Sequence, residues 1–172
     1  MFVIKTPGNN LNERKYILDI IFNEFLDIEY QHKVGSQDYE IILPNESKLI
    51  IEDHFFNQYS RELEYLKKEN LPRKIEYIKN EFINKKELPI IFGTPELIIN
   101  NSDNIICGID IFSSIFFMLS RWEENVNRRR DQHNRFPATE SISYKNGFLE
   151  RAVVDEYIEM LWNMLLHLGF KK

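Results

Sequence analysis

Three side chains in one polar stretch, residues 121–135, are of the types that carry acid–base chemistry. They are Glu123, Asp131 and His133. A carboxylate beside an imidazole can move protons near neutral pH, because histidine titrates there. The stretch lacks the spacing typical of a metal site, such as H-x-x-x-H or C-x-x-C. We therefore take these three residues as the candidates for catalysis, and we expect no metal ion and no other cofactor.

The same stretch holds four candidate binding residues, Arg121, Trp122, Glu124 and Arg135. Its acidic residues come at the end of an apolar helix, where the helix dipole disfavours negative charge. They therefore need cations nearby, and the arginines of the stretch can supply them. The alternative to a site is a salt-bridge cluster that fastens the following loop to this helix.

An apolar helix has to position the polar stretch. Residues 111–119 are apolar on nearly every side, and Asp110 stands where a helix N-cap is wanted. We expect this helix to lie at the centre of the core and to run to about Asn125. Residues 128–148 are predicted to form a long irregular loop, and long loops within compact domains are often functional.

The rest of the chain alternates between strand and helix patterns. Apolar spacing predicts one helix over 11–26 and another from about Val153 to a stop at Gly169, and it favours a helix over 54–70. Strands are predicted over 2–5, 28–34, 38–43, 48–53, 74–79 and 88–93, with a hairpin turning at 100–104. These elements predict an α+β fold with a mixed sheet of short strands and hairpins, one buried apolar helix and flanking helices.

The final helix carries apolar residues beyond its core-facing stripe, namely Met160, Trp162 and Met164. A helix that is apolar on more than one side needs cover on more than one side. We expect a second copy or another domain to cover it. The alternative is that Trp162 packs beneath residues 137–144 of the same chain.

Length and composition set limits on the class of protein. The 172 residues, 43% hydrophobic and 28% charged, predict a single domain over 1–172. A net charge of −5 argues against a nucleic-acid binder. We find no signal-peptide pattern and no apolar run of the roughly 18 residues that a membrane span needs. The single cysteine, Cys107, fits a reducing compartment. We therefore expect a cytoplasmic protein without a membrane span.

One segment of the chain matches a known pattern. The matching residues are Asp110, Ile111, Phe116, Phe117, Arg121, Glu123, Glu124, Asp131, His133, Arg135, Phe136, Pro137, Ser141 and Leu149. With these residues the chain resembles the N-terminal module that precedes the catalytic domain in a group of bacterial polysaccharide deacetylases. The resemblance covers the whole chain loosely and is specific only over 110–149.

The resemblance implies a non-catalytic accessory domain in surface-polysaccharide metabolism, possessing no deacetylase metal site of its own. The partners that we expect are a deacetylase catalytic domain, in cis or in trans, a carbohydrate, and a second copy in a homodimer. Two alternatives stay open. One is an independent hydrolase-type enzyme that uses Glu123, Asp131 and His133, and the other is a protein–protein docking module.

Overall fold

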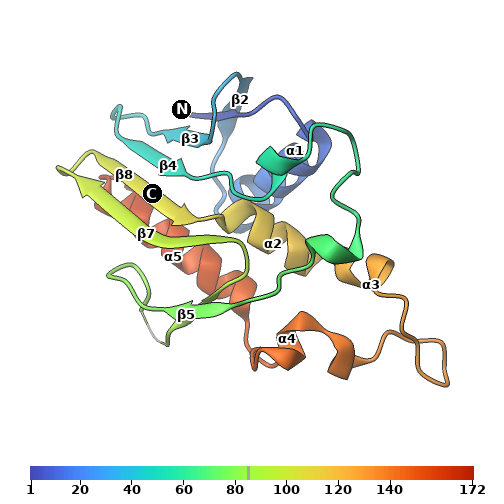
Figure 1. Ribbon diagram of the computed structural model, residues 1–172. Helices are drawn as coiled ribbons and strands as arrows, with labels where there is room; N and C mark the ends of the chain where they lie inside the picture. Colours follow the sequence, from blue (N-terminus) through green and yellow to red (C-terminus); the bar gives the residue numbers. More distant parts are fainter. Residues whose placement is uncertain (85) are drawn as a thin grey trace.

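The computed structural model describes residues 1–84 and 86–172, which form a layer of strands and a layer of helices (Figure 1). The main sheet has the strand order β2-β1-β3-β4-β8-β7. The bounds are Phe2–Thr6 for β1, Tyr30–Val34 for β2, Tyr39–Ile42 for β3, Lys48–Ile51 for β4, Gly93–Asn100 for β7 and Asn104–Ile109 for β8. The pairs β1–β2 and β4–β8 are parallel and the other pairs are antiparallel. The predicted α+β class and mixed sheet are thus confirmed.

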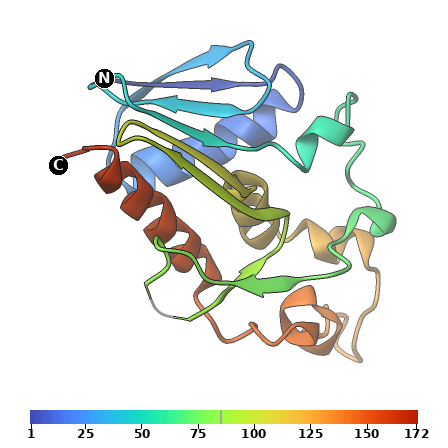
Figure 2. The ribbon, with the colours of Figure 1, turned by 60° about the vertical axis from the view of Figure 1, so that its left-hand side comes forward.

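Three helical segments lie against one face of this sheet (Figures 1 and 2). They are α1 (Leu11–Leu18), which continues as the π-helix η1 (Asp19–Phe25), α2 (Ile111–Ser120) and α5 (Val153–His167). Residues of β1, β3 and β4 alternate between buried and partly exposed, as a sheet covered on one face requires. The other face carries polar groups, including Glu40 between Lys5 and Lys48, each at 3.5 Å.

The remaining elements are short. A second sheet pairs β5 (Glu76–Ile78) with β6 (Leu88–Ile90). The short helices are η2 (Phe56–Gln58), η3 (Lys68–Asn70), α3 (Trp122–Val126), η4 (Ala138–Glu140) and α4 (Ile142–Lys145). The last two interrupt the segment 128–148, which we predicted to be irregular throughout.

The helix favoured over 54–70 is wrong. The side-chain amide of Asn9 donates to the carbonyl oxygens of Phe56 and Tyr59, at 2.7 and 2.9 Å. A continuous helix would use those carbonyls for its own hydrogen bonds. The aromatic residues Phe55, Phe56, Tyr59 and Tyr65 of this segment are nevertheless buried in the core.

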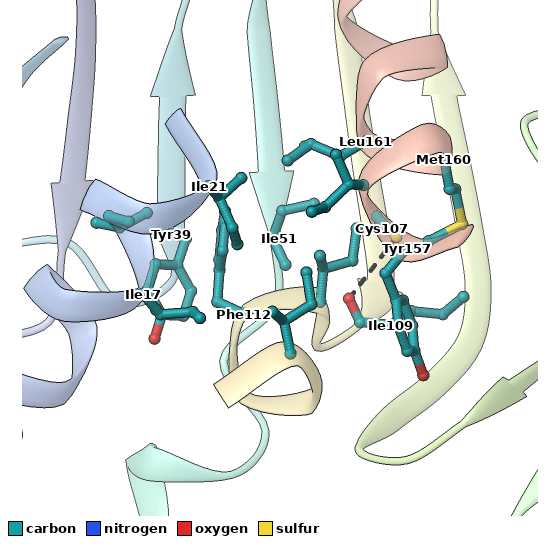
Figure 3. Packing of buried hydrophobic residues seen from close by; sticks show 14 of the residues in the cluster. Ile17, Ile21, Tyr39, Ile51, Cys107, Ile109, Phe112, Tyr157, Met160 and Leu161 are labelled. Carbon is teal, nitrogen blue, oxygen red and sulfur yellow. Dashed lines mark hydrogen bonds between the residues drawn. The ribbon is translucent and has the colours of Figure 1, made fainter. Parts of the chain in front are cut away.

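Helix α2 lies at the centre of the core, as predicted. Figure 3 shows Phe112 of α2 between Ile17 and Ile21 on one side and Tyr157 and Leu161 of α5 on the other. The residues of α2 are buried from its start through Phe117. The helix ends at Ser120, earlier than predicted, because the backbone at residue 121 turns into the left-handed region with φ 54°.

Asp110 caps α2, as the sequence predicts, and it also contacts a second segment. Its carboxylate accepts hydrogen bonds from the backbone N–H groups of Ser113 at 3.1 Å, His54 at 2.9 Å and Phe55 at 3.0 Å. The backbone nearby is too crowded for a side chain at Gly93, where φ is +107° and a Cβ would lie 2.5 Å from the Asp110 nitrogen. Asp110 thus connects the end of β8 to the chain that follows β4.

We predicted that Met160, Trp162 and Met164 of α5 need cover from outside the core. This prediction is wrong for Met160 and Met164. Met160 and Met164 are buried within their own chain. Trp162 is half-buried, and its ring packs edge-on against Phe170 at 5.5 Å between centroids. Phe170 in turn packs against Phe2 at 5.2 Å. Phe170 of the same chain therefore covers part of Trp162, in place of residues 137–144, and cover of this helix by a second copy or another domain stays a prediction.

Because α2 lies at the centre of the core, removing a large side chain from it should greatly lower the free energy of unfolding. Phe116 contacts the rings of Phe56 and Tyr65 at 5.6 and 6.0 Å between centroids. Phe116→Ala should lower the free energy of unfolding by about 3–5 kcal/mol. Leu119→Ala, at the 36% exposed end of the same helix, is the matched control and should change it by under about 1 kcal/mol. Equal denaturation midpoints for the two variants would contradict the placement of α2.

Asp110 also predicts a pH dependence of stability. Burial and the neighbouring Asp53 carboxylate raise the pKa of Asp110 from 3.8 to about 6. The folded state therefore binds this proton more tightly than the unfolded state does. The stability that the proton confers should fall by about 3 kcal/mol as the pH rises from about 4 to about 6. Since Asp110→Asn cannot titrate, the unfolding free energy of the wild type minus that of the variant should shrink over this range. A difference that is flat or grows with pH would disprove this assignment.

Candidate functional site

A cavity of about 230 Å³, the α2–α3 cavity, opens where α2 ends. Its walls come from α2, α3 and the segment 136–149. The lining residues are Phe117, Met118, Arg121, Glu123, Glu124, Phe136, Ala138, Ser141, Ser143 and Leu149. Three of the residues that we predicted from the sequence thus meet at one cavity, namely Arg121, Glu123 and Glu124.

The left-handed turn at Arg121 creates this arrangement. It turns the chain sharply between α2 and α3, and such a conformation is uncommon for a residue with a side chain. Trp122 and Glu123 are consequently buried, at 4% and 7% exposure. Arg121 and Glu124 form an ion pair with each other and are more exposed, at 71% and 31% of their side chains.

Glu123 fastens the loop to the helix, although not through a salt bridge as we had predicted. Its carboxylate oxygen Oε1 accepts a hydrogen bond from the backbone N–H of Ile142 at 2.6 Å, at the start of α4. Burial raises the pKa of Glu123, and the hydrogen bond from Ile142 opposes that rise. One buried carboxylate thereby holds the far wall of the cavity in place.

Asp131, His133 and Arg135 form a separate local turn. The Asp131 carboxylate accepts from the backbone N–H groups of His133 at 2.8 Å and Arg135 at 3.0 Å, and from Arg135 Nε at 3.2 Å. The hydrogen bond from the Arg135 backbone, with help from the others, lowers the pKa of Asp131. The three residues are absent from the lining of the α2–α3 cavity, so the structure does not bring Asp131 and His133 to Glu123.

A second, more open cavity of about 480 Å³ lies beside the first and shares Arg121 and Glu124 with it. Trp122, Tyr65 and Arg130 are among its other lining residues. The indole N–H of Trp122 is buried and has no hydrogen-bond partner among the described residues. A buried donor without an acceptor is unfavourable, so this cavity wall contains an unused hydrogen-bonding group.

Arg130, which we had not named as a site residue, fixes the chain after α3. Its guanidinium donates to the carbonyl oxygens of Glu124 at 3.0 Å and Asn127 at 3.1 Å. It also lies over the ring of Phe136, 5.9 Å from its centroid. This arginine therefore links the end of α3 to the cavity wall that Phe136 forms.

Sequence reasoning also missed a buried ion pair. Arg14 of α1 donates to Asp53 at 2.8 Å, and both side chains are 0% exposed. The Arg14 guanidinium also donates to Asn9 and lies 5.1 Å from the Tyr39 ring centroid. Burial raises the pKa of Asp53, and Arg14 opposes the rise. The available signal was an acid within two residues of the end of an apolar strand, which holds for Asp53 after β4 and for Asp110 after β8.

Within residues 1–84 and 86–172, no three His, Cys, Asp or Glu side chains gather closely enough to hold a metal ion. In the same residues, none of the helices has both the length and the apolarity of a membrane span.

The role of Glu123 in holding the loop can be measured. Glu123→Ala leaves the partly buried N–H of Ile142 without its acceptor, which should cost about 1 kcal/mol of stability and speed hydrogen exchange at that amide. Glu123→Gln keeps an oxygen acceptor and should retain most of the protection. Glu124→Ala removes only a partly exposed ion pair and should cost less than about 1 kcal/mol. Slow exchange at Ile142 in the alanine variant at position 123 would contradict this role.

Of the comparisons with known proteins, the one with protein families gives a match. Neither the curated proteins nor the solved structures contain a match to this chain. The model of a family of unknown function, DUF7033, matches residues 2–169. The chain belongs to that family.

Proposed function

We propose that this chain is a non-catalytic accessory domain that binds a saccharide in the α2–α3 cavity. It acts in surface-polysaccharide metabolism beside a deacetylase catalytic domain, in cis or in trans. The observation that carries the proposal is that Glu123 lines the cavity while its carboxylate holds the backbone of Ile142. Because this carboxylate is already hydrogen-bonded to the backbone, its role in the proposal is to shape the cavity and not to transfer a proton.

The composition of the cavity wall suits a sugar. Phe117, Phe136 and Leu149 supply apolar surface, and Arg121 and Ser141 supply hydrogen-bonding groups. A sugar ring presents C–H groups on its faces and hydroxyl groups at its edge, so it needs both kinds of wall. The volume of about 230 Å³ lies just below the roughly 300 Å³ of the smallest drug-sized sites and suits a single ring.

The link to a deacetylase rests on the resemblance over residues 110–149. The geometry is consistent with that link, because seven of the fourteen matching residues line the α2–α3 cavity. These are Phe117, Arg121, Glu123, Glu124, Phe136, Ser141 and Leu149. Half of the residues that carry the resemblance thus line the proposed binding surface.

A hydrolase-type enzyme is the second candidate, and one observation favours it. Burial raises the pKa of Glu123, as a general acid requires. Against it, Asp131 and His133 are placed in their own turn, so Glu123 has neither of the partners that we predicted for it.

Titration calorimetry with an N-acetylated oligosaccharide and its deacetylated counterpart tests the proposal. The chain should bind at least one of them and release no acetate from the acetylated one. Phe136→Ala removes an apolar wall and should weaken binding about tenfold or more. Tyr144→Ala is the matched control, because Tyr144 is 53% exposed and outside the lining. Absence of binding to either sugar, or acetate release that Glu123→Gln abolishes, would reject the accessory-domain proposal.

A further inference from the structure

The α2–α3 cavity and the second cavity lie side by side, with Arg121 and Glu124 lining both. Residue 121 is the left-handed junction between α2 and α3. Non-glycine residues in this conformation cost free energy and are concentrated at functional sites. The junction presents one arginine to two neighbouring cavities.

The guanidinium of Arg121 has donors to spare. Its nitrogen Nη2 forms an ion pair with Oε1 of Glu124, and the Arg121 side chain is 71% exposed. An arginine offers five N–H donors, and their fork matches the two oxygens of a carboxylate. Glu124 therefore holds the guanidinium in place and leaves other N–H groups available to a ligand.

The stretch 121–135, which begins at this junction, has a charge opposite in sign to that of the whole chain. Residues 121–135 hold five of the nine arginines, against two glutamates and one aspartate, so five minus three gives a local charge of +2. The chain as a whole has a net charge of −5. Arg128 and Arg129 of this stretch are exposed. A local positive field on an acidic protein attracts an anionic ligand to this place.

We infer that the saccharide is acidic, a uronate-type chain whose carboxylate binds the free N–H groups of Arg121. One sugar residue lies in the α2–α3 cavity, and the next lies in the second cavity, on the side of Trp122. The inference rests on the proposed function, since it names the class of ligand for the same site.

The test compares a neutral oligosaccharide with a uronate-containing one of equal length. Arg121→Gly is the informative variant, because glycine adopts a positive φ without strain and should keep the turn folded. The wild type should bind the acidic sugar at least about tenfold more tightly than the neutral one, as expected for a charge-assisted hydrogen bond. Arg121→Gly should abolish this preference, and added salt should reduce it. Lys33→Gln, which removes an exposed positive charge from β2 outside both cavity linings, should preserve it.

Fluorescence supplies a second readout. The chain has two tryptophans, so Trp162→Phe leaves Trp122 as the only indole. Its emission should change when the acidic sugar binds and stay constant with Arg121→Gly.

Equal affinity for the acidic and neutral sugars, or equal effects of Arg121→Gly and Lys33→Gln, would overturn the inference and leave the proposed function standing. Failure of both sugars to bind would remove both proposals. Arg121-dependent binding of single-stranded nucleic acid in place of either sugar would also overturn the inference.

Discussion

The structure depends on one buried carboxylate. Asp110 accepts three backbone N–H groups, from Ser113 at the start of α2 and from His54 and Phe55 after β4. It thereby fixes the direction in which α2 leaves the sheet, and α2 in turn carries the junction at residue 121 and the two cavities. Burying a charge is costly unless its hydrogen bonds are satisfied, which explains why three donors converge there. The pair of Arg14 and Asp53 does the same for α1 at the neighbouring strand end.

The sequence predicts the elements whose pattern is local. Short apolar runs bounded by turn residues predict the strands, apolar residues at helical spacing predict α1 and α5, and the nearly all-apolar run of α2 predicts a buried helix. The segment 54–70 could not be predicted in this way. Its conformation depends on Asn9, which is distant in sequence and takes the carbonyl groups of Phe56 and Tyr59. The cover of Trp162 by Phe170 was missed for the same reason, because it is a contact of the folded chain end.

The candidate site was predictable in part. Arg121, Glu123 and Glu124 reach one cavity because they are adjacent at a helix end. Their charge partners were assigned wrongly, since local geometry provides closer ones. Arg121 pairs with Glu124 three residues away, and Asp131 closes a turn on Arg135. Such pairs form with little loss of chain entropy, whereas a salt bridge across the loop would have to order both segments.

The parallel pairing of β4 with β8 sets the order in which the molecule can be completed. Leu49 pairs with Ile105, and the segments joined by Asp110 are 56 residues apart. The chain must lose the entropy of closing this long loop before the contacts between β4 and β8 can stabilise the fold, so these contacts form slowly. During synthesis, β1 to β4 emerge first and leave β4 as an unpaired edge until β8 follows. An exposed strand edge invites pairing with other chains. Between the emergence of residues 51 and 109, β4 therefore presents an unpaired edge that the completed sheet no longer has.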